Sequence, residues 1–265
     1  MLLFIIPFIR VCDNGGGCGI TITEKSRGHE REECKMTDII NVAVIAGTPV
    51  DTQMGVKFIE EKSSREGDPV SAFYLPVSEN CDDQTRFQYM DYAAKRARMD
   101  EIFDYAASQG IEDFFIYCNS LSGAFDFESY AVERGVRIYT PLQIYSRIAG
   151  NYRRVGVVAA NNISAHKIEQ TMIASNSEIY VIGTGNMAIV SAIEAGLPPE
   201  DIVRDCGIEH MVRYIEACGC EALILGCTHF PYLKEVIRGF CRIPLIDPAD
   251  EMYGELLRGY APDRG

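Results

Sequence analysis

Two segments share one pattern, an apolar run that ends in a cysteine and leads into hydrogen-bonding residues. They are Phe114–Ser120, which contains Cys118, and Ala222–His229, which contains Cys227. A buried strand that stops at a thiol places that thiol at the carboxyl end of a parallel sheet, where α/β proteins bind ligands. Two facing thiols suit one kind of chemistry: a thiolate removes a proton from a carbon atom, and a thiol returns one to the opposite face.

The residues that follow each cysteine fit this chemistry. A helix start can lower the pKa of a thiol from about 8.5 towards neutrality. Asn119, Ser120 and Thr228 supply donors that can bind a carboxylate, together with backbone N–H groups at helix starts. His229 is placed to donate a hydrogen bond or to assist Cys227. The alternative is that the cysteines only pack in the core, but finding the pattern twice favours function.

The loop at residues 47–52 leaves two interpretations open. It follows the first predicted strand and contains Thr48, Pro49, Asp51 and Thr52. In one interpretation the loop only caps the next helix. In the other, Asp51 and Thr52 face the cleft and contact a substrate ammonium group or a catalytic thiol.

Motifs for common cofactors are absent from the sequence. No G-x-G-x-x-G follows the first predicted strand, and there is no G-x-x-x-x-G-K-[ST], so we expect no nucleotide cofactor. Cys218, Cys220 and Cys227 lie close in sequence, but C-x-x-C pairs are absent and Cys227 ends a strand that aims it away from Cys218. We therefore expect no metal site.

The composition limits the partners. The formal net charge is −13 over 265 residues, with 47% hydrophobic and 24% charged residues. This balance is ordinary for a globular protein. The excess of acidic residues argues against nucleic acid and anionic membranes as partners. The spacing of the ten cysteines does not indicate a disulfide framework, and we expect a cytoplasmic protein.

The first 35 residues differ from the rest of the chain. The apolar run at residues 1–9 is too short to span a bilayer, and it lacks the features of a signal peptide. Residues 11–35 are polar and rich in glycine, without a sustained period. We expect residues 1–35 to form a disordered extension.

From residue 41 onward, apolar strands alternate with helical segments. The strands predicted are Val42–Ala46, Phe114–Cys118, Val155–Ala160, Ile179–Ile182, Ala222–Gly226 and Pro244–Ile246. The longer predicted helices are Thr52–Ser63, Thr85–Gln109, Ala165–Ser175 and Ile202–Cys218. This alternation predicts an α/β fold of two pseudosymmetric Rossmann-like lobes with parallel sheets and a cleft between them. The first lobe would hold residues 40–139 and 235–258, and the second would hold residues 140–234.

Three motifs carry a resemblance to a known family. The segment Leu223–Pro231 resembles the second catalytic motif of glutamate racemases in the aspartate/glutamate racemase superfamily. Cys118-Asn119-Ser120 resembles the first motif, commonly Cys-Asn-Thr. Asp51-Thr52-x-x-Gly55 is similar to the early Asp-Ser-Gly motif. The resemblance covers residues 40–258.

The resemblance implies a cofactor-independent amino-acid racemase with two catalytic cysteines. Cys118 would serve one enantiomer and Cys227 the other, with His229 and Asp51 tuning the thiols. The residues implied for binding the carboxylates of a small acidic amino acid, such as glutamate or aspartate, are Asn119, Ser120, Thr228 and Thr52. A homodimer is compatible with the resemblance.

Two departures lie where the substrate side chain would be recognised. Ser120 replaces threonine, and the family's Pro-Tyr-Gly loop has no clear counterpart, so residues 75–77 or 78–85 would stand in for it. Two other functions stay open: an isomerase of another small diacid, similar to maleate isomerase, and a sensor that binds an amino acid without turnover.

Overall fold

The computed structural model describes residues 39–260, so the prediction for residues 1–35 lies outside it. The described chain forms two four-stranded sheets whose strand pairs are all parallel. The first sheet has the order β2-β1-β3-β4, with β1 (Ile40–Ala46), β2 (Val70–Pro76), β3 (Asp113–Ile116) and β4 (Arg137–Tyr139). The second has the order β6-β5-β7-β8, with β5 (Arg154–Ala159), β6 (Tyr180–Gly185), β7 (Ala222–Gly226) and β8 (Leu245–Ile246). The predicted fold class is confirmed.

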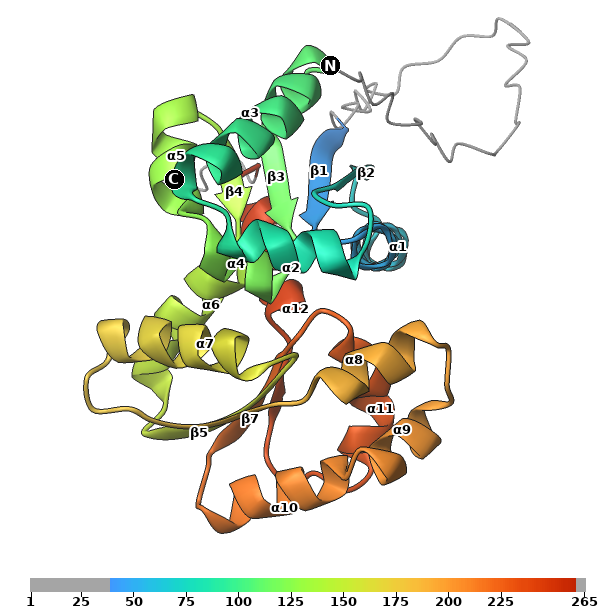
Figure 1. The fold of residues 1–265 in the computed structure, drawn as a ribbon, viewed down its shortest axis with the longest axis vertical. Coiled ribbons are helices and arrows are strands. Elements are labelled where there is room, and N and C mark those ends of the chain that lie inside the picture. Colours follow the sequence, from blue (N-terminus) through green and yellow to red (C-terminus); the bar gives the residue numbers. More distant parts are fainter. Residues whose placement is uncertain (1–38, 261–265) are drawn as a thin grey trace, which may run out of the picture.

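Both sheets connect their strands in the same way. In each, the first strand in the chain lies between the second and the third, and the fourth lies outside the third. Cys118 comes two residues after the third strand of the first sheet, and Cys227 directly follows the third strand of the second. The repeated connectivity therefore brings each cysteine to the equivalent edge of its own sheet. Figure 1 shows β1 and β3 pointing towards the second lobe.

Helices accompany both sheets (Figure 1). The first lobe carries α1 (Pro49–Glu66), α2 (Cys81–Tyr89), α3 (Tyr92–Ser108), α4 (Asn119–Ala124) and α5 (Phe127–Arg134). Then follow α6 (Pro141–Ile148), α7 (Asn162–Ser175), α8 (Met187–Glu194), α9 (Pro199–Asp205), α10 (Ile208–Ala217), α11 (Lys234–Arg238) and α12 (Pro248–Arg258). Two short 3-10 helices cover Ala149–Asn151 and Phe230–Leu233.

Local signals divide two of the predicted helices. The segment 85–109 breaks after α2, because Met90 is extended and the Asp91 side chain accepts a hydrogen bond that caps α3. The segment 202–218 breaks at Gly207, whose φ of 66° is left-handed and suits glycine. The strands β2 and β4 were not predicted, since β2 is only partly buried along most of its length and β4 has three residues.

The chain returns to the first lobe later than predicted. Residues 235–258 were expected in the first lobe, but β8 pairs with β7 in the second sheet. The crossing follows at Asp247, whose side chain accepts a hydrogen bond from the backbone of Ala249 and caps α12. The buried residues of α12 then join the core of the first lobe, with Tyr253 and Leu256 almost fully covered.

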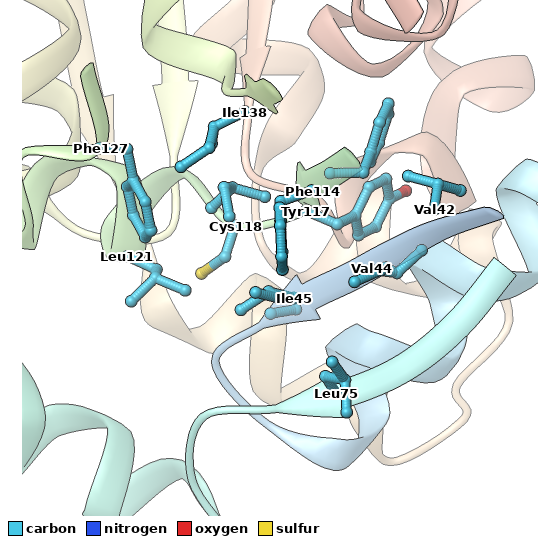
Figure 2. Close-up of a cluster of buried hydrophobic side chains, with 14 of the residues drawn as sticks. Val42, Val44, Ile45, Leu75, Phe114, Tyr117, Cys118, Leu121, Phe127 and Ile138 are labelled. Carbon is cyan, nitrogen blue, oxygen red and sulfur yellow. The ribbon is translucent and has the colours of Figure 1, made fainter. Parts of the chain in front are cut away.

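Cys118 lies at the edge of the first lobe's core. Figure 2 shows its side chain beside Ile45 and Leu121, while Tyr117 points away from it. Only 3% of Cys118 is exposed. Helix α1 packs closely on the same sheet through Gly55: a Cβ atom there would lie 2.7 Å from Val44 Cγ1 and 2.8 Å from Tyr117 Cγ.

Gly55→Ala is expected to lower the free energy of unfolding by about 2 kcal/mol, because the added methyl group has no room. A matched control is Gly254→Ala in α12, where the nearest atom would be 3.5 Å away on the flexible Arg258 side chain. That variant should gain up to about 1 kcal/mol from helix propensity. Urea unfolding measures both. Stabilisation by both substitutions would contradict the close packing of α1.

Candidate active site

A cavity of about 110 Å³ lies between the two lobes and is lined by both cysteines. Seven of the eight residues that the sequence singled out line it: Asp51, Cys118, Asn119, Ser120, Cys227, Thr228 and His229. The exception is Thr52, which is fully buried in the first turn of α1 and donates its hydroxyl hydrogen to the Thr48 carbonyl oxygen at 2.7 Å. The structure therefore does not bring Thr52 to the cavity.

Cys118 stands at the start of α4 among hydrogen-bond donors. Its Sγ lies 3.2 Å from Ser120 Oγ and accepts a hydrogen bond from Gln84 Nε2 at 3.4 Å. Burial and, to a smaller extent, the nearby Asp51 carboxylate raise the pKa of this thiol to about 11. The hydrogen bonds from Ser120 and from backbone N–H groups act in the opposite direction.

Cys227 has a different partner, the imidazole of His229. The distance between Cys227 Sγ and His229 Nδ1 is 3.6 Å. The other ring nitrogen, Nε2, lies 3.2 Å from Glu194 Oε1 at the end of α8. Burial raises the pKa of the Cys227 thiol well above its usual value, with a further contribution from Asp51. A thiol, an imidazole and a carboxylate thus form a chain along which a proton can move.

Asp51 lies on the other side of the same imidazole. Its Oδ1 is 3.0 Å from His229 Nε2, an ion-pair distance, but this oxygen accepts no hydrogen bond from the described residues. Burial raises the pKa of Asp51 from 3.8 to about 6, which the charge of His229 partly counters. The loop before α1 also caps the helix, since Thr48 accepts from the Asp51 N–H. The loop therefore caps the helix, as the first interpretation has it, and it also brings Asp51, but not Thr52, to the cavity.

Two tyrosine hydroxyl groups connect the cysteine segments across the lobes. Tyr117 donates a hydrogen bond to the Thr228 carbonyl oxygen at 3.3 Å, and Tyr145 of α6 donates one to Asn119 Oδ1 at 2.7 Å. With its oxygen engaged, the Asn119 amide leaves Nδ2 without a partner among the described residues, and the same holds for Ser164 Oγ. Both groups are buried and belong to the cavity wall.

Three residues of the site were missed by the sequence analysis: Gln84, Ser164 and Glu194. Glu194 had a usable signal, because it is the only charged residue of α8 and stands at the helix C-terminus, where the helix dipole disfavours an acid. Nothing in the sequence distinguishes Gln84 from other polar residues of α2. Ser164 reads as an ordinary residue in the first turn of α7.

Within residues 39–260, no group of three metal-binding side chains has an arrangement that would hold an ion. No helix in the same range has the length and apolar character needed to cross a bilayer.

Comparison with known proteins places the chain in a family. Residues 57–253 match the sequence model described as Asp/Glu/Hydantoin racemase. The chain belongs to this family. Among curated relatives, the glutamate racemase of Acidothermus cellulolyticus is 27% identical over 162 residues, which make up 59% of this chain and 61% of the relative. The aligned part thus spans about three-fifths of that protein.

Solved structures share the fold at lower identity. The glutamate racemase of Francisella tularensis, solved in complex with D-glutamate, aligns with a TM-score of 0.60 at 18% identity, covering 83% of this chain and 81% of the other. The allantoin racemase of Klebsiella pneumoniae aligns with a TM-score of 0.55 at 14% identity, covering 84% and 88%. The shared architecture therefore extends to relatives named for different substrates.

Asp51→Asn is expected to stabilise the protein in a pH-dependent way. The folded state holds the Asp51 proton more tightly than the unfolded state, so ionisation costs stability as the pH rises from 3.8 to about 6. The variant avoids this cost and should gain about 3 kcal/mol at pH 8 but only about 1 kcal/mol at pH 4.5. Urea unfolding at both pH values tests this. An equal effect at the two pH values would show that the carboxylate is not strained by burial.

Proposed function

We propose that this family member is a cofactor-independent amino-acid racemase that uses Cys118 and Cys227 as its acid and base. One observation carries the proposal: two thiols, each following the third strand of its own sheet, line the same cavity. A racemase needs a proton acceptor on one face of the carbon atom and a proton donor on the other. The names of the relatives support the reaction class, since glutamate racemases and an allantoin racemase occur among them.

In the proposed reaction the thiols exchange roles. The Cys227 thiolate takes the Cα proton, and the Cys118 thiol gives its proton to the opposite face, so the protein ends with Cys227 protonated and Cys118 as thiolate. The reverse reaction restores the first state. His229 can accept the Cys227 proton at Nδ1, which lies 3.6 Å from Cys227 Sγ, when its Nε2 donates a hydrogen bond to Glu194 Oε1 at 3.2 Å.

The neutral donors of the cavity suit a substrate carboxylate. Asn119 Nδ2 and Ser164 Oγ are buried and have no hydrogen-bond partner among residues 39–260, and a substrate carboxylate would satisfy both. Ser120 and Thr228 add two hydroxyl groups to the same wall. The carboxylates of Asp51 and Glu194 provide the charge that a substrate ammonium group needs. Glutamate, aspartate or a related acidic amino acid remains the predicted substrate.

The decisive experiment is proton NMR in D2O with the L and D forms of glutamate and aspartate, and with allantoin. Wild-type protein should replace the proton on the stereogenic carbon of one compound by deuterium and invert it. Cys118→Ser and Cys227→Ser should each reduce inversion by about a hundredfold or more, because each removes one acid–base group. Cys206→Ser is the matched control, since this cysteine directly follows α9 and does not line the cavity.

Other outcomes would redirect the assignment. Inversion that survives in either cavity variant would contradict the two-thiol mechanism. Binding of an amino acid without exchange by the folded, reduced protein would favour a sensor. Isomerisation of maleate without amino-acid exchange would favour a diacid isomerase.

Tyr145→Phe tests the role proposed for Asn119 in binding. Losing the hydroxyl group leaves Asn119 Oδ1 unpaired and frees the amide to rotate. We expect KM to rise about tenfold with a smaller change in kcat, because the amide contacts the carboxylate equally in the ground and transition states. Tyr214→Phe, at a position 62% exposed, is the control. A fall in kcat with an unchanged KM would argue against carboxylate binding by Asn119.

A further inference from the structure

The two thiols of the cavity have unlike partners, although the sheets that carry them are alike. Cys227 faces an imidazole backed by a carboxylate. The hydrogen bonds to Cys118 come from neutral donors, and the side chain among them that reaches it from outside its own loop is Gln84 of α2. Gln84 cannot take up a proton, so whatever it does for Cys118 differs from what His229 does for Cys227.

The Gln84 amide has a geometry that directs hydrogens at the sulfur. Its Nε2 donates to Cys118 Sγ at 3.4 Å and to Ser120 Oγ at 3.1 Å. Because the Ser120 oxygen accepts from Gln84, its own hydrogen is available for Cys118 Sγ, 3.2 Å away. Both contacts therefore stabilise the thiolate more than the thiol, since hydrogen bonds to a charged acceptor are the stronger ones.

The backbone leaves space for this amide. A Cβ atom at Gly47, directly after β1, would lie 2.1 Å from Gln84 Nε2. Phe87, one turn further along α2, is 3% exposed and anchors the helix in the first lobe's core. The glycine and the anchored helix together hold the amide over the sulfur.

We propose that Gln84 is a positioning residue that makes Cys118 usable as a base, by donating to its thiolate and by orienting Ser120. This rests on the proposed function for its meaning in a reaction, but the effect on the thiol needs no substrate. The two thiols would then be activated by different means: Cys227 by proton transfer to His229, and Cys118 by neutral donors that offset the burial of its charge.

The test is the alkylation rate of Cys118 in the native protein, followed by mass spectrometry of its peptide with iodoacetamide between pH 7.5 and 9.5. Gln84→Met keeps the volume and removes the donor, and it should raise the pKa by about one unit. A rise of one unit lowers the thiolate population of Cys118 about tenfold. The thiolate that remains is more nucleophilic, which offsets part of this loss, so the alkylation rate should fall about three- to fivefold at each pH.

Two further variants make the result specific. Gln88→Met changes the next glutamine on the cavity face of α2, for which no hydrogen bond to Cys118 is found in the described part of the chain, and it should leave the rate unchanged. Gly47→Ala displaces the Gln84 amide without removing it and should act like Gln84→Met. Circular dichroism confirms that the variants are folded, and the Cys227 peptide should react as in wild type throughout.

The inference is overturned if Gln84→Met alkylates at the wild-type rate, or if Gln88→Met slows Cys118 equally. It is also overturned if native Cys118 does not react at any pH while the unfolded protein does, because the sulfur would then not open to the cavity. Each of these results is independent of turnover. Racemisation that requires Cys118 together with an unchanged alkylation rate would therefore reject Gln84 and keep the proposed function.

Discussion

The burial of negative charge is the constraint on which this site depends. Two thiols and the Asp51 carboxylate share one small cavity, and burial raises the pKa of all three groups. Two thiolates beside an ionised Asp51 would repel one another in a medium that screens poorly. Keeping a proton on at least one of the three groups avoids that state. The proposed proton exchange between Cys118 and Cys227 would do so, because one cysteine is a thiol whenever the other is a thiolate.

The fold brings the two buried thiols together from separate sheets. Each sheet brings one cysteine to the end of its third strand. Tyr117 joins the two cysteine segments through a buried hydrogen bond to Thr228, and Tyr145 of α6 adds a buried hydrogen bond to Asn119. Symmetric connectivity sets where the sulfurs lie. In the proposed mechanism, the unlike side chains around them, His229 for Cys227 and Gln84 for Cys118, set how each sulfur loses its proton.

The sequence predicted the parts of this structure that depend on local pattern. Continuous apolar runs identified the buried strands. The polar residues after Cys118 and Cys227 contribute four of the residues that line the cavity, because strand ends of parallel sheets converge. Long-range contacts were not accessible. Gln84 reaches Cys118 from a helix 34 residues earlier, and Glu194 reaches His229 from 35 residues earlier. Thr52 was misplaced because a helix turn rotates it away from Asp51, into a hydrogen bond with its own helix start.

Asp51 and Glu194 lie beside the same imidazole, but their carboxylates differ in burial and in hydrogen bonding. Both carboxylates face the same nitrogen of His229, yet only Glu194 accepts a hydrogen bond there, and its side chain is 24% exposed. Asp51 is 3% exposed, and its Oδ1 accepts no hydrogen bond from the described residues. Glu194 can therefore orient the imidazole at little cost in stability. Ionised Asp51 lowers the stability of the folded protein, because its carboxylate is buried. A substrate ammonium group near Asp51 would offset the cost of burying its negative charge. The carboxylate that lowers stability is therefore the one that would gain most from binding the ammonium group of the proposed substrate.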